Sequence, residues 1–186
     1  MYNANNMYYY NKMYQCPYYT NMLMYNSGLW SMIPKQYVPY TCQPHTGTPI
    51  ILKDYGPNPF VVNIEEAAKQ NNNFRIALWT GSHLQLTLMS INVGEDIGLE
   101  VHPNLDQFVR IEKGQGLVKM GDRKDRLDFQ RKVYDDYAFI IPAGKWHNLI
   151  NTGNKPLKLY SIYAPPQHPF GTIHKTKKDA EEHHEH

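Results

Sequence analysis

Residues 94–114 read GEDIGLEVHPNLDQFVRIEKG, and this stretch decides the expected fold. Glu100 and His102 lie two residues apart in a predicted strand, so their side chains point to the same face. Pro103 ends that strand, and a turn after it can bring Gln107 back beside them at the start of the next strand. The stretch therefore predicts that three side chains with metal-ligating atoms meet where two strands join.

A second stretch, residues 142–151, reads PAGKWHNLIN and predicts a tight turn followed by a strand. His147 shares a strand face with Leu149, which is the pattern of a side chain that points into a core. Two imidazoles, one carboxylate and one amide oxygen can thus converge inside the fold, from Glu100, His102, Gln107 and His147. Two histidines and a carboxylate suit first-row divalent ions and can leave coordination positions open.

The rest of the chain from residue 74 consists of short strand signals separated by Gly, Pro, Asn and Asp. This spacing is typical of a sandwich or barrel. No long helical pattern alternates with the strands, so we expect an all-β fold rather than a parallel α/β sheet. The predicted strands cover residues 74–80, 84–93, 97–102, 107–112, 116–120, 127–133, 138–141, 146–151 and 157–163.

The first stretch resembles the first sequence motif of the cupin superfamily. That motif reads Gly, five residues, His, one residue, His, three or four residues, Glu, six residues, Gly. In this chain Gly94 begins the motif, and Glu100 stands where the family has its first histidine. His102 matches the second histidine, Gln107 stands at the glutamate position, and Gly114 closes the motif.

Residues 142–151 resemble the second cupin motif, Pro-x-Gly-x-x-His-x-x-x-Asn, although Asp136 replaces the glycine expected at its head. The resemblance covers residues 75–164. Asp106 competes with Gln107 as the fourth ligand, but six residues after it the chain has Lys113 rather than glycine.

The resemblance implies a double-stranded β-helix, the jelly-roll barrel of small single-domain cupins, and a homodimer. It also implies a divalent metal ion of undetermined identity: Mn, Fe, Zn, Ni or Co. The metal positions that it implies are Glu100, His102, Gln107 and His147. Glutamate for histidine keeps a good ligand, whereas glutamine for glutamate weakens one and lowers the negative charge.

Residues 1–48 differ sharply from the rest of the chain. They hold ten of the fifteen tyrosines and six of the eight methionines, and Lys12 and Lys35 are their only Lys, Arg, Asp or Glu residues. Because no period of 2 or 3.6 would bury one face, we expect a disordered arm rich in Tyr, Asn and Met. The alternative is an adhesive arm that binds assembly partners, since such arms resemble those of spore-coat proteins.

The remaining segments follow from local signals. Residues 49–73 are expected to form a linker and a short helix over 63–69, capped by Asn63. Residues 74–166 are expected to form the barrel. Residues 167–186 are expected to leave it as a frayed C-terminal tail.

Composition excludes several classes of partner. The net charge is +2, and basic and acidic residues are interspersed, so we expect no nucleic-acid binding. No apolar run approaches the roughly 20 residues that span a bilayer, so we expect no membrane partner. The N-terminus lacks the pattern of a secretory signal, and we expect a cytoplasmic protein. Cys16 and Cys42 lie outside the predicted barrel and are expected to be free thiols.

Two functions fit these features. The first is a metal-dependent enzyme that performs isomerase, epimerase or oxygenase-type chemistry on a small oxygen-rich substrate; no catalytic residue can be assigned. Small barrels of this kind resemble those related to mannose-6-phosphate isomerase, but a sugar phosphate needs cations at the barrel mouth. Arg110 and Lys145 are the nearby candidates, and strand parity turns Arg110 away from Gln107. The alternative is a structural component of a spore-coat-like assembly, with the barrel as scaffold.

Two further histidines lie outside the motifs. His83, just before a predicted strand, is expected to be an ordinary surface residue. His168 follows the predicted barrel, and one interpretation is that it folds back over the barrel mouth.

Overall fold

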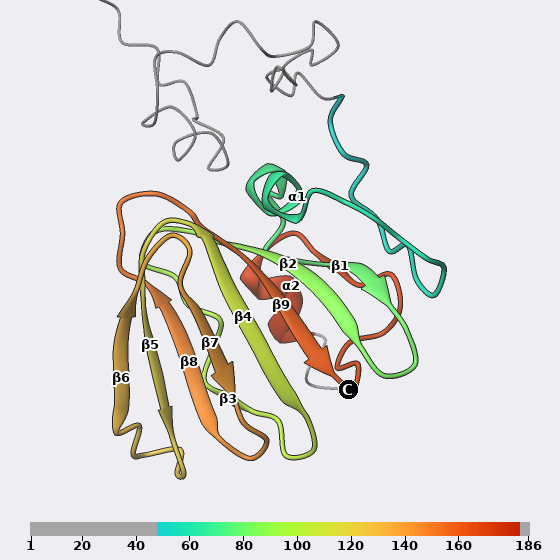
Figure 1. The fold of residues 1–186 in the computed structure, drawn as a ribbon. Helices are drawn as coiled ribbons and strands as arrows, with labels where there is room; N and C mark the ends of the chain where they lie inside the picture. The colour runs from blue at the N-terminus through green and yellow to red at the C-terminus, as the bar shows by residue number, and fades with distance from the viewer. Residues whose placement is uncertain (1–47, 183–186) are drawn as a thin grey trace, which may run out of the picture. The chain divides into compact units, whose positions relative to one another are not determined.

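The computed structural model describes residues 48–182 and shows an all-β fold with two short helices (Figure 1). The helices are α1 (Ile64–Gln70) and α2 (Lys177–Glu182). The strands are β1 (Arg75–Thr80), β2 (Gln85–Ile91), β3 (Glu100–Val101), β4 (Asp106–Lys113), β5 (Gly116–Gly121), β6 (Phe129–Val133), β7 (Ala138–Ile141), β8 (Trp146–Asn151), β9 (Leu157–Ala164) and β10 (Ile173–His174).

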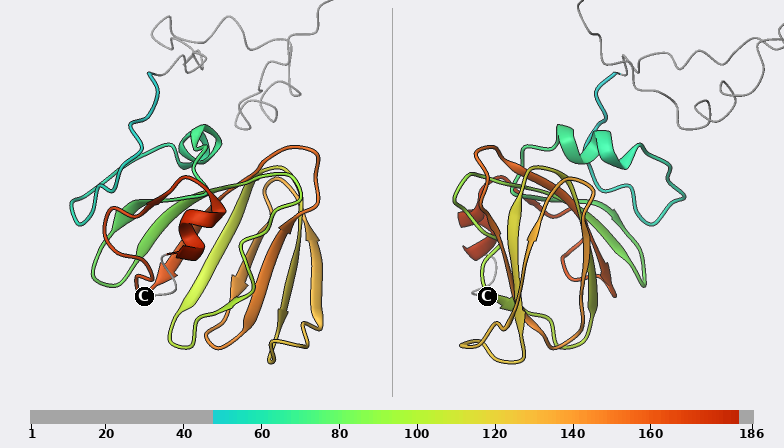
Figure 2. Two further views of the ribbon diagram at one scale, coloured as in Figure 1. Left: turned by 180° about the vertical axis from the view of Figure 1, so that it is seen from behind. Right: turned by 60° about the vertical axis from the view of Figure 1, so that its left-hand side comes forward.

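The strands form two antiparallel sheets that face each other (Figure 2). The larger sheet has the order β10-β1-β2-β9-β4-β7, and the smaller one has the order β3-β8-β5-β6. Sequence neighbours such as β4 and β5 therefore lie in different sheets, while distant strands such as β2 and β9 pair. This arrangement is the jelly-roll barrel that the motifs imply, and it confirms the predicted fold class.

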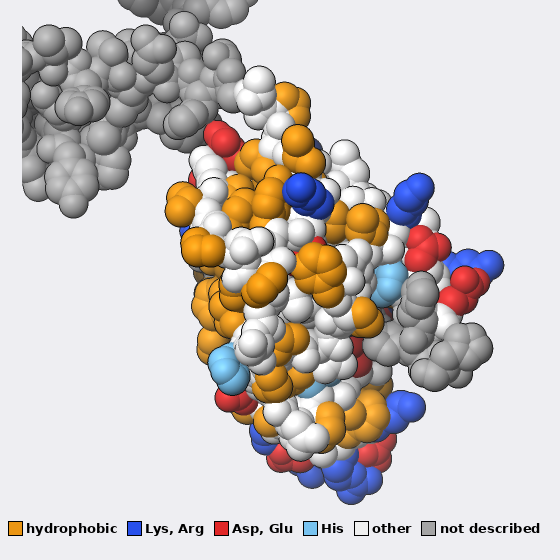
Figure 3. Space-filling model, turned by 90° about the vertical axis from the view of Figure 1, so that its right-hand side faces the viewer, with side chains coloured by type: hydrophobic (Ala, Val, Ile, Leu, Met, Phe, Trp, Pro, Cys, Tyr) orange, Lys and Arg blue, Asp and Glu red, His pale blue; other side chains and the backbone are white. Residues whose placement is uncertain are grey.

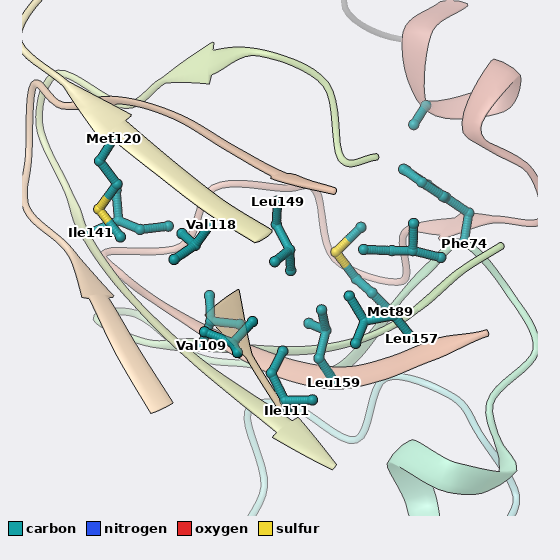
Figure 4. Close-up of a cluster of buried hydrophobic side chains, with 13 residues drawn as sticks. Phe74, Met89, Val109, Ile111, Val118, Met120, Ile141, Leu149, Leu157 and Leu159 are labelled. Carbon is teal, nitrogen blue, oxygen red and sulfur yellow. The ribbon is translucent and has the colours of Figure 1, made fainter. Parts of the chain in front are cut away.

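The core lies between the sheets, where alternate strand residues point inward (Figure 4). Val109 and Ile111 of β4 face the core from the larger sheet, and Val118 and Leu149 face it from the smaller one. All four have 3% exposure or less. The predicted inward parity of β4 and β8 is therefore confirmed, and it fixes the direction of the candidate ligands on these strands.

One predicted strand is much shorter than expected. Residues 97–102 were predicted to be extended, but β3 contains only Glu100–Val101. The reason is a local turn: the Gly98 amide donates a hydrogen bond to Asp96 Oδ1 at 2.8 Å, and Gly98 has φ of +90°. A positive φ interrupts a strand, so the extended segment begins after the glycine.

Helix α1 covers part of the outer face of the larger sheet. The Asn63 side chain caps it by accepting a hydrogen bond from the Glu66 amide at 3.2 Å, as predicted. Ala67 and Ala68 are fully buried and pack on a cluster that includes Ile76, Leu78 and Leu88.

Hydrophobic side chains are spread over the side of the molecule that lies at the right of Figure 1 (Figure 3).

The C-terminal segment differs from the expected frayed tail. His168 is buried, His174 of β10 pairs with Arg75 of β1, and Ala180 of α2 joins the core between the sheets. Gln85 starts this return, because its amide oxygen accepts from the His168 amide at 2.9 Å and its nitrogen donates to the His168 carbonyl at 2.8 Å. The Gln85 side chain thus binds the backbone of a segment that was expected to leave the barrel.

The Tyr-rich arm, both cysteines and the three histidines at the end of the chain lie outside the described residues. Within residues 48–182, no helix is long and apolar enough to cross a membrane.

We predict that the C-terminal helix contributes to stability. Changing Ala180, which is 4% exposed, to Glu would bury a carboxylate in the core and lower the free energy of unfolding by about 3 kcal/mol. Lys178→Ala on the exposed side of the same helix should change it by less than about 0.5 kcal/mol. Urea unfolding measures both. Equal, small effects would show that α2 does not contribute to the core.

Candidate metal centre

Three of the four predicted ligands meet inside the barrel. One ligand atom each of Glu100, His102 and His147 lies within 4.8 Å of the others. Glu100 of β3 stands directly opposite His147 of β8, so both side chains point to the same face of the smaller sheet. His102 follows β3, and its carbonyl accepts a hydrogen bond from the Gly144 amide at 2.8 Å. This bond ties the turn of the second motif to the strand of the first.

The spacing of these atoms leaves room for an ion. His102 Nε2 lies 3.7 Å from Glu100 Oε2, and His147 Nε2 lies 4.0 Å from Glu100 Oε1. The two imidazole rings are 5.2 Å apart between centroids and tilted by 53°. Metal ions bind imidazole nitrogen and carboxylate oxygen at roughly 2 Å, so one ion can lie between atoms with these separations.

The surroundings of His147 hold its ring in the form that binds metals. Its Nδ1 lies 3.0 Å from the Lys145 carbonyl, which can only accept, so Nδ1 carries the proton. The lone pair of Nε2 then faces the barrel interior, where this atom is buried without a hydrogen-bond partner. Burial lowers the pKa of His147, and the hydrogen bond to Lys145 opposes this effect without cancelling it. The imidazole therefore stays neutral, as a metal ligand requires.

Gln107 points into the same cavity from the larger sheet. Its Nε2 donates to Ser161 Oγ at 2.8 Å, and Ser161 Oγ donates onward to the Phe108 carbonyl at 3.2 Å. This chain fixes the amide so that Oε1 faces the interior, where it is buried without a hydrogen-bond partner. Asp106, the competing candidate, is exposed and accepts from the Ala143 amide at 2.9 Å. The structure thus directs Gln107, and not Asp106, toward the histidines.

A divalent ion fits this donor set. Gln107 Oε1 and His147 Nε2 are buried acceptors that no protein donor satisfies, and both line one cavity with the Glu100 carboxylate. A buried polar atom without a hydrogen bond lowers the stability of the fold by roughly 1–3 kcal/mol. A cation bound beside these two acceptors and the carboxylate would remove this cost. The identity of this ion is not determined by the donors.

The cavity is lined by both polar and apolar side chains. Its polar groups are the ligand candidates Glu100, Gln107 and His147, together with Asn148 and Tyr163. No Lys or Arg is among its lining residues within the described part of the chain. The apolar lining residues are Met89, Ile97, Val109, Val118, Phe139, Ile141, Leu149 and Leu159.

The two cations considered from the sequence lie elsewhere. Arg110 bonds Asp136 at 2.8 Å on the outer side of β4, as its parity predicted. Lys145 pairs with Asp122 at the surface. Neither faces the cavity, so the barrel lacks the cluster of cations that a phosphate group needs.

Tyr163 links the site to the C-terminal segment. It is fully buried, with its ring edge-on to His102 at 5.8 Å and to His168 at 5.1 Å between centroids. Burial raises the pKa of Tyr163, so the phenol stays protonated. His168 does fold back, and it packs behind Tyr163, whereas His83 is exposed as predicted.

Sequence reasoning missed Arg75. This residue of β1 is 1% exposed, and its Nη2 lies 4.0 Å from Glu100 Oε1. A lone arginine in the apolar run FRIALW was the only available signal, and its inward direction follows from sharing a strand face with Ala77.

Comparisons with known proteins agree with this geometry. A protein-family model described as a cupin domain matches residues 87–163. The uncharacterized protein YrkC of Bacillus subtilis (strain 168) is 60% identical over 177 residues, which are 89% of this chain and 93% of that protein. The uncharacterized protein L612 of Acanthamoeba polyphaga mimivirus is 43% identical over 115 residues, which are 61% of this chain and 70% of that protein. The crystal structure of BH2720 from Bacillus halodurans is 69% identical in sequence and superposes with a TM-score of 0.70. The match covers 70% of this chain and 99% of the BH2720 chain.

We predict that His147→Ala abolishes tight metal binding, because it removes an imidazole whose lone pair already faces the cavity. After dialysis against a weak chelator, elemental analysis should find about one divalent ion per wild-type chain and almost none in the variant. The control is His83→Ala, which removes an exposed histidine and leaves the C-terminal histidines in place. Equal metal content in both variants would place the metal outside the barrel.

Changes at Gln107 test whether its oxygen ligates the ion. Gln107→Leu keeps the side-chain volume but removes the oxygen, and should weaken the affinity by about tenfold, whereas Gln107→Glu should strengthen it by adding charge. Isothermal titration with Zn²⁺ or Mn²⁺ measures both. If neither change alters the affinity, Gln107 serves only to bond Ser161.

Proposed function

The chain belongs to the cupin superfamily, and on this premise we propose that it is a metal-dependent enzyme acting on a small substrate inside the barrel. The ion would be held by Glu100, His102 and His147, with Gln107 as the fourth ligand. The observation that carries the proposal is the pair of buried, unsatisfied acceptors, Gln107 Oε1 and His147 Nε2, that face one cavity with the carboxylate. A barrel with a purely structural role has no reason to leave such atoms without donors.

The donor set suits Mn, Fe, Zn, Ni or Co. Two imidazoles, a carboxylate and an amide oxygen occupy four positions, which leaves open positions on an ion of higher coordination number. An ion bound there would supply Lewis-acid chemistry, and iron or manganese would also supply oxygen chemistry.

The cavity lining favours an unphosphorylated substrate. A sugar phosphate presents a dianion and several hydroxyls, which need cations and many hydrogen-bonding partners. Among the described residues that line the cavity there is no Lys or Arg, and beyond the ligand candidates the polar side chains are Asn148 and Tyr163. The mostly apolar lining favours a small substrate that presents an oxygen donor to the ion and an apolar group to the rest of the cavity.

The same lining favours oxygenase-type chemistry over isomerisation or epimerisation. An isomerase moves protons between carbons and needs a base that is not a metal ligand. Within the described residues that line the cavity, every histidine and carboxylate belongs to the ligand set. Tyr163 remains, and because burial raises its pKa it would act as a hydrogen-bond or proton donor to a bound oxygen atom.

The test is to reconstitute the metal-free chain separately with each of the five ions. Oxygen uptake and product formation by NMR are then followed with small oxygen-bearing compounds that have apolar bodies, and with sugar phosphates of similar size. We expect turnover with Fe²⁺ or Mn²⁺ and only in the first group. It should be lost in His147→Ala and kept in His83→Ala.

Isomerisation of sugar phosphates, or equal turnover in both histidine variants, would contradict the proposed function. The first result would overturn the substrate class and the reaction type. The second would overturn the metal centre as the site of reaction.

A further inference from the structure

A single arginine lies inside the barrel beside the candidate metal centre. Arg75 of β1 stands opposite Met89 of β2, and Met89 belongs to the core between the sheets. Opposed residues of an antiparallel pair project to the same side, so Arg75 also points inward. Its side chain is 2% exposed, which is rare for a residue that is always charged.

The surroundings of Arg75 offer one carboxylate. Its Nη2 lies 4.0 Å from Glu100 Oε1, its guanidinium stacks over the Phe74 ring at 5.6 Å, and it approaches the buried Tyr163 closely enough to influence the pKa of that phenol. Its Nε is buried without a hydrogen-bond partner. The guanidinium is therefore compensated by charge rather than by a full set of hydrogen bonds.

The negative charge of Glu100 in turn requires a positive charge nearby. Its side chain is 18% exposed, and its oxygens lie 3.7 Å from His102 Nε2 and 4.0 Å from His147 Nε2. Without a metal ion, Arg75 is the permanent cation within 4.0 Å of this carboxylate among the described residues. A buried charge that loses its partner destabilises a fold strongly.

We propose that Arg75 is an internal counter-ion that positions Glu100 for the metal. In the metal-free protein Arg75 carries the charge that balances the carboxylate, and when an ion binds, the carboxylate is shared between the ion and the guanidinium. Arg75 is thus a positioning residue that acts through Glu100. Only the sharing of Glu100 with an ion rests on the proposed metal function. The pairing of Arg75 with Glu100 does not require a metal.

The experiment is a double-mutant cycle with Arg75→Met, Glu100→Gln and the double variant, measured by urea unfolding of chelator-treated protein. Methionine keeps an unbranched side chain in the core, and glutamine keeps the shape of Glu100 without its charge. We expect Arg75→Met to increase the unfolding equilibrium constant by at least about 100-fold in the wild-type background. In the Glu100→Gln background the same change should increase it by less than about tenfold, because the charge that Arg75 balances is already absent.

A second readout excludes a packing role. Saturating Mn²⁺ should raise the melting temperature of Arg75→Met by more than it raises that of wild type, because the ion replaces the missing cation beside Glu100. Arg75→Lys retains the charge and should stay closer to wild type than Arg75→Met in both measurements. If Arg75→Met fails to fold, folding of the double variant supports the counter-ion, and failure of both variants overturns it.

The outcomes separate the two proposals. Equal cost of Arg75→Met in both backgrounds would overturn the counter-ion and leave Arg75 as a packing residue. If Mn²⁺ and Zn²⁺ shift neither wild type nor any variant while the coupling persists, the counter-ion stands and the proposed metal function fails. If the double-mutant cycle shows coupling, but the metal raises the melting temperatures of wild type and Arg75→Met equally, the sharing of Glu100 with the ion is overturned.

Discussion

The pairing of β3 with β8 is the constraint on which the site depends. β3 contains only two residues, yet its register places Glu100 opposite His147 and turns both side chains into the barrel. The turn before β8 then holds the backbone of His102 through the Gly144 amide. A slip of one residue would point these side chains to solvent, so the backbone hydrogen bonds of a very short strand determine whether three ligands can meet.

Charge balance inside the barrel follows from this placement. The first cupin motif has a histidine where this chain has Glu100, so the chain adds a negative charge among buried side chains. The guanidinium of Arg75, 4.0 Å away, offsets that charge, so the pair has no net charge. Gln107 contributes in the same direction, because an amide in place of a carboxylate avoids a second buried negative charge. The two departures from the motif and the buried arginine are thus parts of one electrostatic arrangement.

The residues that local pattern could predict are those whose direction depends on strand parity alone. Glu100, His147 and Leu149 were placed by alternation in short strands, and the two-sheet fold followed from the turn residues between them. Arg75 could not be placed in the same way, because its partner lies 25 residues away and on the other sheet. Strand parity predicts that a side chain points inward, but it does not identify the charged group that the side chain contacts there.

The return of the C-terminal segment was also beyond local pattern. Its composition is polar, and it is held by the Gln85 amide at the His168 backbone, by the pairing of β10 with β1 and by Ala180 in the core. These contacts leave no hydrophobic period in the segment itself. Gln85 and Gln107 stand on either side of Tyr163 across the larger sheet, so three inward polar residues form one row.

This row gives the segment a role at the site. Gln107 directs its oxygen to the cavity, Tyr163 lines the cavity, and Gln85 fixes the histidine that packs behind the Tyr163 ring. The ring contacts His102 and His168 edge-on, so its position depends on both the first motif and the end of the fold. A segment that was expected to fray therefore contacts, through His168, the tyrosine that lines the cavity.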